Sequence, residues 1–230
     1  MSSHMNRRTL ILGLAAGGAL VVLPSPAFAQ GLNLSSILSS ATDSALDKLA
    51  QPGAFYGDEA VRIAPPLVGG SGGGLGGIFG SIMSASEKLG VLGPITRQIN
   101  DAAGAAAGEA KPIFRDAIDG LSFNDAPGII KQADGGTQYL RRSSNDTLHA
   151  KLEPLVDTAL GDLGVYTTFD SLAEKHSFVR QAGLNRESIN RSVTDQGLDG
   201  IFTYVGNEER AFRKNPVGNI GKTLGDIFGN

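Results

Sequence analysis

Two groups of charged residues in this sequence could do chemistry together, although they lie far apart along the chain. The first group is Arg141 and Arg142, and the second is Asp199, Glu208 and Glu209. A guanidinium group can bind a carboxylate or a phosphate through two parallel hydrogen bonds. We therefore expect arginine from the middle of the chain to meet acidic groups from near its end. The result would be either an ion-pair network that fixes how helices pack or the polar floor of a ligand pocket.

The arginines lie in a segment, residues 135–163, whose apolar residues recur at the spacing of one helix face. Counting back from Leu148 at about 100° per residue places Ser144, Arg141 and Thr137 on the same stripe, with Asn145 beside it. Because an unpaired buried guanidinium is very costly, Arg141 would need a carboxylate partner in the interior. The alternative is that the helix frays at Ser143–Ser144 and Arg141 points into water.

The acidic group lies in a second long predicted helix, from Asn185 to Lys214. Glu208 falls on the stripe that carries Ile201, Tyr204 and Phe212, so we expect it to face the core. Glu209 shares a face with Phe202, and Asp199 lies next to it. We predict that Arg141, alone or together with Arg142, pairs with Glu208 or Asp199 in the interior. Thr137, Tyr139 and Asn145 would satisfy the remaining hydrogen bonds. The candidate ligand-binding or buried polar cluster comprises Thr137, Tyr139, Arg141, Arg142, Asn145, Asp199, Glu208 and Glu209.

Other chemistries have little support in the sequence. There is no cysteine, which excludes disulfides, thiolate metal sites and cysteine nucleophiles. His149 and His176 do not lie in a cluster with metal-ligand spacing, so we expect capping or surface roles for them. Residues 69–80 are dense in glycine and match a dinucleotide-binding pattern by letter, but no strand precedes them, which favours a flexible loop. We predict no catalytic residue, no metal and no cofactor.

The beginning of the chain is typical of an export signal. Arg7 and Arg8 precede an apolar run from Leu10 to Leu23, and Ala27-Phe28-Ala29 is a small-x-small cleavage site. We predict that residues 1–29 are removed and that the mature protein is periplasmic. The run from Asn6 to Ile11 also resembles a twin-arginine signal, and the export route stays open.

The mature chain should be acidic. Removing the leader takes two arginines from the 20 basic residues, so the 23 acidic residues outnumber the basic ones by five. This balance argues against a nucleic-acid partner. No further apolar stretch is long enough to span a membrane.

Helical spacing dominates the mature chain and strand-like alternation is nearly absent. We predict that residues 30–230 form a single all-α domain, an irregular bundle of about eight helices with a Gly-rich loop. An extended connector, residues 56–66, joins the first helix to that loop. The predicted helices cover residues 34–49, 78–89, 94–110, 112–118, 122–130, 135–163, 164–175 and 185–214, with a terminal turn or two at 223–228. Pro154 predicts a kink or a restart of the central helix near residues 150–153.

Several phrases of the chain resemble a bacterial family known as domain of unknown function 4197. They are Thr137-Gln138-Tyr139-Leu140-Arg141-Arg142, Leu198-Asp199-Gly200-Ile201-Phe202, the run from Glu208 to Pro216, the Val-Arg-Ile connector that begins at Val61, and a Phe-x-Asp-Ala-Ile helix at Phe114 to Ile118. The resemblance extends from Leu32 to Gly229. It implies an exported, mostly helical protein and implies no activity. The chain departs from the usual pattern at Gly69 to Gly77.

Three hypotheses for the function follow. The first is a non-catalytic periplasmic protein that binds a ligand or a partner, such as an amphiphilic small molecule or an envelope protein. The second is a hydrolase-like enzyme that uses buried carboxylates such as Asp199 and Glu208. The third is a scaffold for other proteins of the cell envelope.

Overall fold

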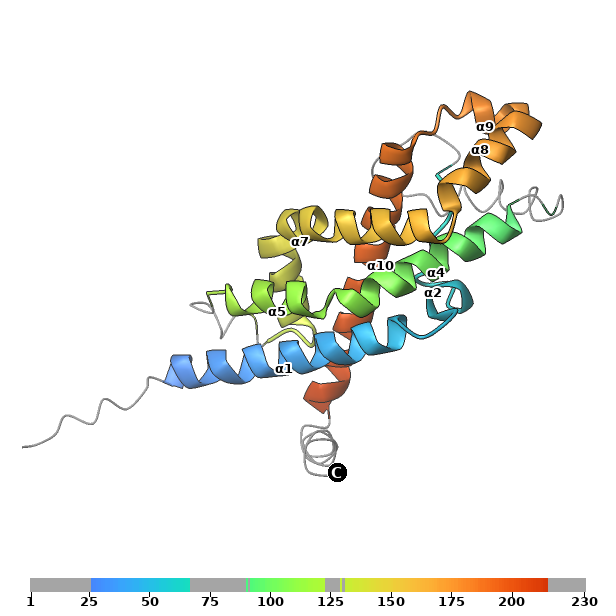
Figure 1. Cartoon of the computed structure of the whole chain (residues 1–230). Coiled ribbons are helices and arrows are strands. Elements are labelled where there is room, and N and C mark those ends of the chain that lie inside the picture. The colour runs from blue at the N-terminus through green and yellow to red at the C-terminus, as the bar shows by residue number, and fades with distance from the viewer. Residues whose placement is uncertain (1–25, 67–89, 91, 123–128, 130, 215–230) are drawn as a thin grey trace, which may run out of the picture.

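The described part of the chain is built from helices alone. The computed structural model describes residues 26–66, 90, 92–122, 129 and 131–214, and no strand occurs within these ranges (Figure 1). The helices are α1 (Pro26–Leu49), α2 (Ala54–Gly57), α4 (Gly93–Glu109), α5 (Lys111–Asp119), α7 (Gly135–Asp162), α8 (Val165–Lys175), α9 (Ser177–Gln181) and α10 (Arg186–Lys214). The predicted all-α class is confirmed.

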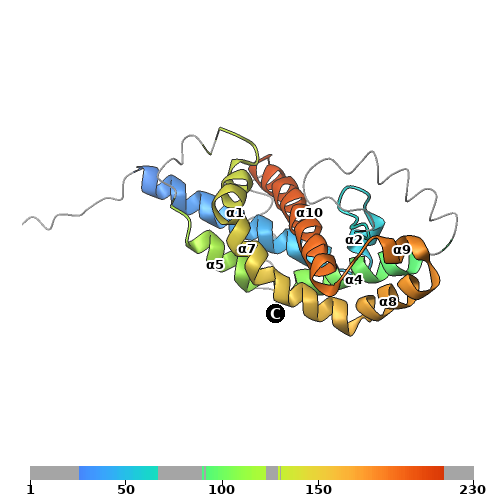
Figure 2. The same cartoon turned by 90° about the horizontal axis from the view of Figure 1, so that it is seen from above.

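The core lies where the long helices cross. Helix α10 packs against both α1 and α7, and α4 packs against α7 and α1 (Figures 1 and 2). Apolar residues from all four helices are buried there, among them Leu46, Ile99, Leu148 and Val205. Burying such side chains supplies the main driving force for folding. The rings of Phe114 on α5 and Phe202 on α10 add an edge-to-face contact, with centroids 6.1 Å apart.

The two longest predicted helices have nearly the bounds that the sequence indicated. The central helix α7 ends one residue before the predicted Leu163, and α10 begins one residue after the predicted Asn185. Pro154 lies inside α7, which remains continuous but is visibly bent (Figure 1). Helices α2 and α9 were not predicted, and α2 includes Tyr56 and Gly57, the first two residues of the predicted extended connector. Several predicted segments lie outside the described residues. They are the leader up to Ser25, the Gly-rich loop, the helix at residues 78–89, most of the helix at 122–130 and the turn at 223–228.

Two side-chain amides hold the extended connector that precedes the loop. The buried Asn100 accepts a hydrogen bond from the Ile63 amide and donates one to the Ile63 carbonyl, both at 2.8 Å. Gln196 makes the same pair of bonds to Ala64, at 3.0 and 3.1 Å. Each side-chain amide therefore bonds to both the N–H and the C=O of one connector residue, as the backbone of a neighbouring strand would. The connector is thus attached to α4 on one side and to α10 on the other.

Helices α8 and α9 form a hairpin at one end of the molecule, away from α5 (Figures 1 and 2). The turn before α8 is made at Gly164 and the turn after α9 at Gly183, both in the left-handed region at φ 69° and 62°. Helix α8 rests on α4 and α7, whereas α9 packs on α8. Within the described residues, no helix is both long and apolar enough to cross a membrane.

Candidate functional site

The first turn of α7 is closed by a carboxylate from another helix. The first amide groups of any helix lack partners within that helix. Glu209 of α10 accepts hydrogen bonds from the amides of Gly136 at 3.0 Å and Thr137 at 2.7 Å. It also accepts one from the Thr137 hydroxyl at 2.6 Å. A negative charge at this end of a helix is favoured by the helix dipole as well.

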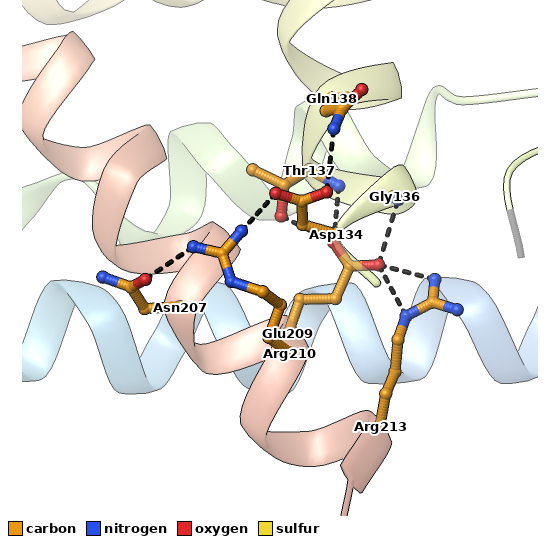
Figure 3. A network of polar contacts seen from close by, with 8 residues as sticks. All are labelled: Asp134, Gly136, Thr137, Gln138, Asn207, Glu209, Arg210 and Arg213. Carbon is orange, nitrogen blue, oxygen red and sulfur yellow. Dashed lines mark hydrogen bonds and ion pairs between the residues drawn. The ribbon is translucent and has the colours of Figure 1, made fainter. Parts of the chain in front are cut away.

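Further ion pairs hold the same junction (Figure 3). Arg213, one turn after Glu209, donates from Nε at 2.9 Å and from Nη2 at 2.6 Å to Oε1 of Glu209. Arg210 pairs with Asp134, the residue before α7, and donates to Asn207 at 2.6 Å. We call this set the α7–α10 clamp: Asp134, Gly136, Thr137, Glu209, Arg210 and Arg213.

The α7–α10 clamp leaves no room for a ligand at Glu209. The side chain of Glu209 is fully buried, and both of its oxygens already accept hydrogen bonds. A Cβ atom added to Gly136 would lie 2.9 Å from Oε1 of Glu209, so only glycine allows this approach. The arrangement is therefore a structural junction that fixes the start of α7 against the end of α10.

The predicted pairing of Arg141 with Asp199 is present, but its predicted place in the interior is wrong. The two side chains form an ion pair with 48% and 62% of their surfaces exposed. The guanidinium lies over the ring of Phe202, 5.3 Å from its centroid. The arginine thus covers apolar surface with its stem and keeps its charge in water.

The reason is the register of the buried row on α7. Buried residues on this helix recur every four positions, at Gly136, Leu140, Ser144, Leu148, Leu152, Val156 and Leu160. A row of this kind forms where a partner helix crosses at an angle. Leu140 therefore takes the buried position and Arg141 lies beside it. Thr137 and Ser144 are buried as predicted.

The expectation that Glu208 faces the core with Arg141 is also wrong. Glu208 accepts a hydrogen bond from Ser44 at 2.7 Å and forms an ion pair with Lys48, both on α1. The buried row on α10 again steps by four residues, through Val193, Gly197, Ile201, Val205 and Glu209. Glu209 is thus the buried acid.

The other predicted site residues are scattered. Arg142 is exposed and forms no ion pair within the described residues. Tyr139 donates to the carbonyl of Ser122 at 2.7 Å, and Asn145 is half-buried with Asp146 at 3.4 Å. The structure therefore brings together Arg141 with Asp199, and Thr137 with Glu209, but no single eight-residue cluster.

His176 has the capping position that was expected, and His149 is partly exposed as expected, but its Nε2 atom is buried. His149 is partly exposed with Nε2 3.0 Å from Asp195 on α10. His176 is the residue that ends α8. In the described ranges, no three metal-ligating side chains come together as a group.

A cleft that the sequence did not reveal lies between the α8–α9 hairpin and the start of α10. It encloses about 380 Å³. Its walls combine apolar and charged side chains: Tyr166, Phe169, Asp170, Ala173, Val179, Arg180, Leu184, Asn185, Arg186 and Ile189. Arg141 is not among them. Because α9 has five residues and its sequence shows no repeating pattern, periodicity could not place this wall.

One side of the cleft is held by a charged cluster of Asp157, Tyr166 and Arg186. Asp157 accepts hydrogen bonds from the Tyr166 hydroxyl at 2.6 Å and from Arg186 at 2.9 and 2.7 Å. The bonds from Arg186, and then that from Tyr166, hold the pKa of Asp157 below its usual value. Burial and the neighbouring Asp157 raise the pKa of Tyr166. Arg186 also stacks 4.6 Å from the centroid of the Tyr166 ring.

Comparison with known proteins gives a family and no activity. The family model described as "Protein of unknown function (DUF4197)" matches residues 25–229. No curated protein and no solved structure matches the chain.

Proposed function

The chain belongs to the DUF4197 family, which is described only as of unknown function, and from its geometry we propose that it is a non-catalytic binding protein for a small amphiphile. The proposed site is the cleft between α8, α9 and α10. The single observation that carries this proposal is the composition of the cleft wall. It places half-buried apolar side chains, Ala173 and Leu184, and the ring of Tyr166 beside charged ones such as Arg180.

The size of the cleft supports a small ligand. Ligand sites in proteins usually enclose roughly 300–1,000 Å³ and are lined mainly by apolar side chains with a few polar ones. The cleft, at about 380 Å³, lies near the lower end of that range. A cavity of about 150 Å³ holds benzene. A single short alkyl chain with a polar head therefore fits this volume better than a two-chain lipid does.

A fluorescent apolar probe tests the proposal. N-phenyl-1-naphthylamine becomes brighter in an apolar site, and we expect saturable uptake with one molecule per chain. Ala173→Phe should fill the cleft and abolish uptake, because Ala173 is half-buried in its wall. Ala105→Phe is the matched control, since Ala105 is exposed on α4. Absence of uptake by the wild type, or equal uptake by the two variants, would remove the proposal.

We also propose that the protein is exported and that it binds its ligand in the periplasm. The support is the leader pattern at residues 1–29. The cleavage point after Ala29 would lie in the first turn of α1, which begins at Pro26. Expression of the full chain in a Gram-negative host should give a periplasmic protein whose N-terminal residue is Gln30. An uncleaved protein in the cytoplasm would contradict this part of the proposal.

The hydrolase hypothesis receives less support from the acids that were named for it. Asp199 is exposed beside Arg141, and Glu208 already contacts Ser44 and Lys48. A general acid or base usually has a pKa shifted by its surroundings and lies in a pocket. Neither residue lines the cleft.

A further inference from the structure

The cleft carries one available charge of each sign. Asp170 on α8 and Arg180 on α9 both line it, and both are exposed. Within the described part of the chain, Asp170 forms no ion pair or hydrogen bond. Among the same described residues, the guanidinium of Arg180 donates only to the carbonyl of Ala173, at the long distance of 3.5 Å. The two side chains do not form an ion pair with each other in this structure.

The third charged side chain of the cleft is already balanced. Arg186 donates from two nitrogens to the two oxygens of Asp157, a geometry that matches guanidinium to carboxylate. Its charge is therefore neutralised within the protein, and its position is fixed by stacking on Tyr166. A ligand in the cleft would find Arg180 as the cation and Asp170 as the anion.

From this arrangement we infer that the ligand is a zwitterionic amphiphile with a single short apolar chain. This inference rests on the proposed function of the same cleft. Its anionic group would lie at Arg180, its ammonium group at Asp170 and its tail against the half-buried Tyr166 ring, Ala173 and Leu184. A purely anionic head would meet the carboxylate of Asp170, and a purely cationic head would meet Arg180. Repulsion between these like charges should weaken the binding of both kinds of ligand.

A matched series of decyl probes tests the charge preference. We would measure binding of N-decyl-N,N-dimethylglycine, decanoate, decyltrimethylammonium and decanol by isothermal titration calorimetry, below the concentration at which micelles form. Exposed charge pairs are worth roughly 0.2–1 kcal/mol each, or up to about fivefold in affinity. The zwitterion should therefore bind about two- to fivefold more tightly than each of the other probes.

Single charge changes should reorder the series. In Asp170→Asn the repulsion of anions is removed, so decanoate should become the preferred probe. In Arg180→Gln, decyltrimethylammonium should become the preferred probe. Arg191→Gln is the matched control, because Arg191 is exposed on α10, pairs with Glu187 and does not line the cleft. It should leave the order of the four probes unchanged.

The outcomes separate this inference from the function on which it rests. If decanol and the zwitterion bind equally well, or if neither variant changes the order, the zwitterion inference fails while the binding function stands. If none of the four probes binds, the proposed function fails. Sedimentation with phosphatidylethanolamine vesicles, without uptake of the single-chain zwitterion, would also overturn the inference, since the protein would then recognise a membrane surface.

Discussion

At the scale of single residues, Glu208 and Glu209 are neighbours in the sequence with opposite surroundings. Glu209 is fully buried and accepts hydrogen bonds from two amides, one hydroxyl and Arg213. Glu208 is partly exposed and pairs with Lys48, whose side chain is 54% exposed. The two acids should therefore differ strongly in what they contribute to stability.

Replacing Glu209 by alanine should lower the free energy of unfolding by about 3–5 kcal/mol, because removing one partner of a buried ion pair leaves the others unsatisfied. Glu208→Ala should cost about 1 kcal/mol or less. Urea denaturation followed by circular dichroism measures both changes. Added formate should partly restore Glu209→Ala by entering the space that the carboxylate leaves. Equal losses in the two variants would show that the α7–α10 clamp does not stabilise the fold.

The choice between these two acids shows what residue-level prediction can achieve here. Helical spacing correctly indicates that acids of α10 and polar residues of α7 approach each other. It fails by one residue on each helix, giving Arg141 in place of Leu140 and Glu208 in place of Glu209. A row of buried residues that steps by four positions winds slowly around its helix. How far the row winds depends on the angle at which the partner helices cross that helix. The crossing angle is a property of the tertiary structure and cannot be read from the spacing of residues along the sequence.

Asp157 should make the stability of the protein depend on pH in the acid range. Its pKa in the folded state is lowered, first by Arg186 and then by Tyr166. The stabilisation is therefore complete above the unfolded pKa of about 3.9 and is lost as the pH falls through the lower folded value. Between pH 7 and pH 2, the free energy of unfolding of Asp157→Asn should fall by about 1 kcal/mol less than that of the wild type.

Urea midpoints measured at closely spaced pH values test this expectation. Asp162→Asn is the control, because Asp162 lies exposed at the end of the same helix and forms no ion pair within the described residues. Its acid profile should follow that of the wild type. An Asp157→Asn profile that also follows the wild type would mean that the Arg186 and Tyr166 bonds are not kept in solution.

At the scale of elements, two of the three glycines of α7, Gly136 and Gly161, have opposite roles. A Cβ atom on Gly136 would lie 2.9 Å from Glu209 and 3.1 Å from Leu34 on α1. A Cβ atom on Gly161 would have Arg186 as its nearest neighbour, at 4.0 Å. The first glycine is required where α1, α7 and α10 meet, and the second only weakens the helix.

Gly136→Ala should therefore destabilise the protein by about 1–3 kcal/mol, the usual cost of forcing extra atoms into a packed junction. Gly161→Ala should stabilise it by about 0.5–1 kcal/mol, because alanine loses less backbone freedom in a helix. Thermal unfolding of the two variants shows directly whether each substitution raises or lowers the stability of the protein. Tolerance of alanine at position 136 would mean that α10 does not approach α7 as closely as described.

The long helices were predictable because their signals are local. Proline and glycine mark the ends of these helices, and a repeating apolar face runs along each of them, as in α4 between Gly93 and Ala110. The cleft was not predictable, because its walls come from three helices and one of them is a single short turn. No spacing within the chain relates Asp170, Arg180 and Asp157 to one another.

At the scale of the whole molecule, the described helices form a tightly crossed body, against which α2 and α5 pack, and a hairpin at its end. The body consists of α1, α4, α7 and α10, whose contacts bury most of the core. Among the hairpin side chains whose burial the structure describes, Val165, Phe169 and Val179 are the buried ones. The proposed binding cleft lies between the two parts, so a bound ligand would connect the hairpin to the body.

Amide hydrogen exchange should reveal this division. Segments with few buried apolar contacts open at lower free energy than the global unfolding of the protein. A five-residue helix such as α9 also has little stability of its own. We expect peptides from residues 165–181 to exchange much faster than those from the middle of α7 and α10. A saturating amphiphile should slow exchange in the hairpin and at the start of α10 while leaving α1 unchanged. The Ala173→Phe variant should show no such protection, and protection spread evenly over all helices would instead indicate a ligand bound outside the cleft.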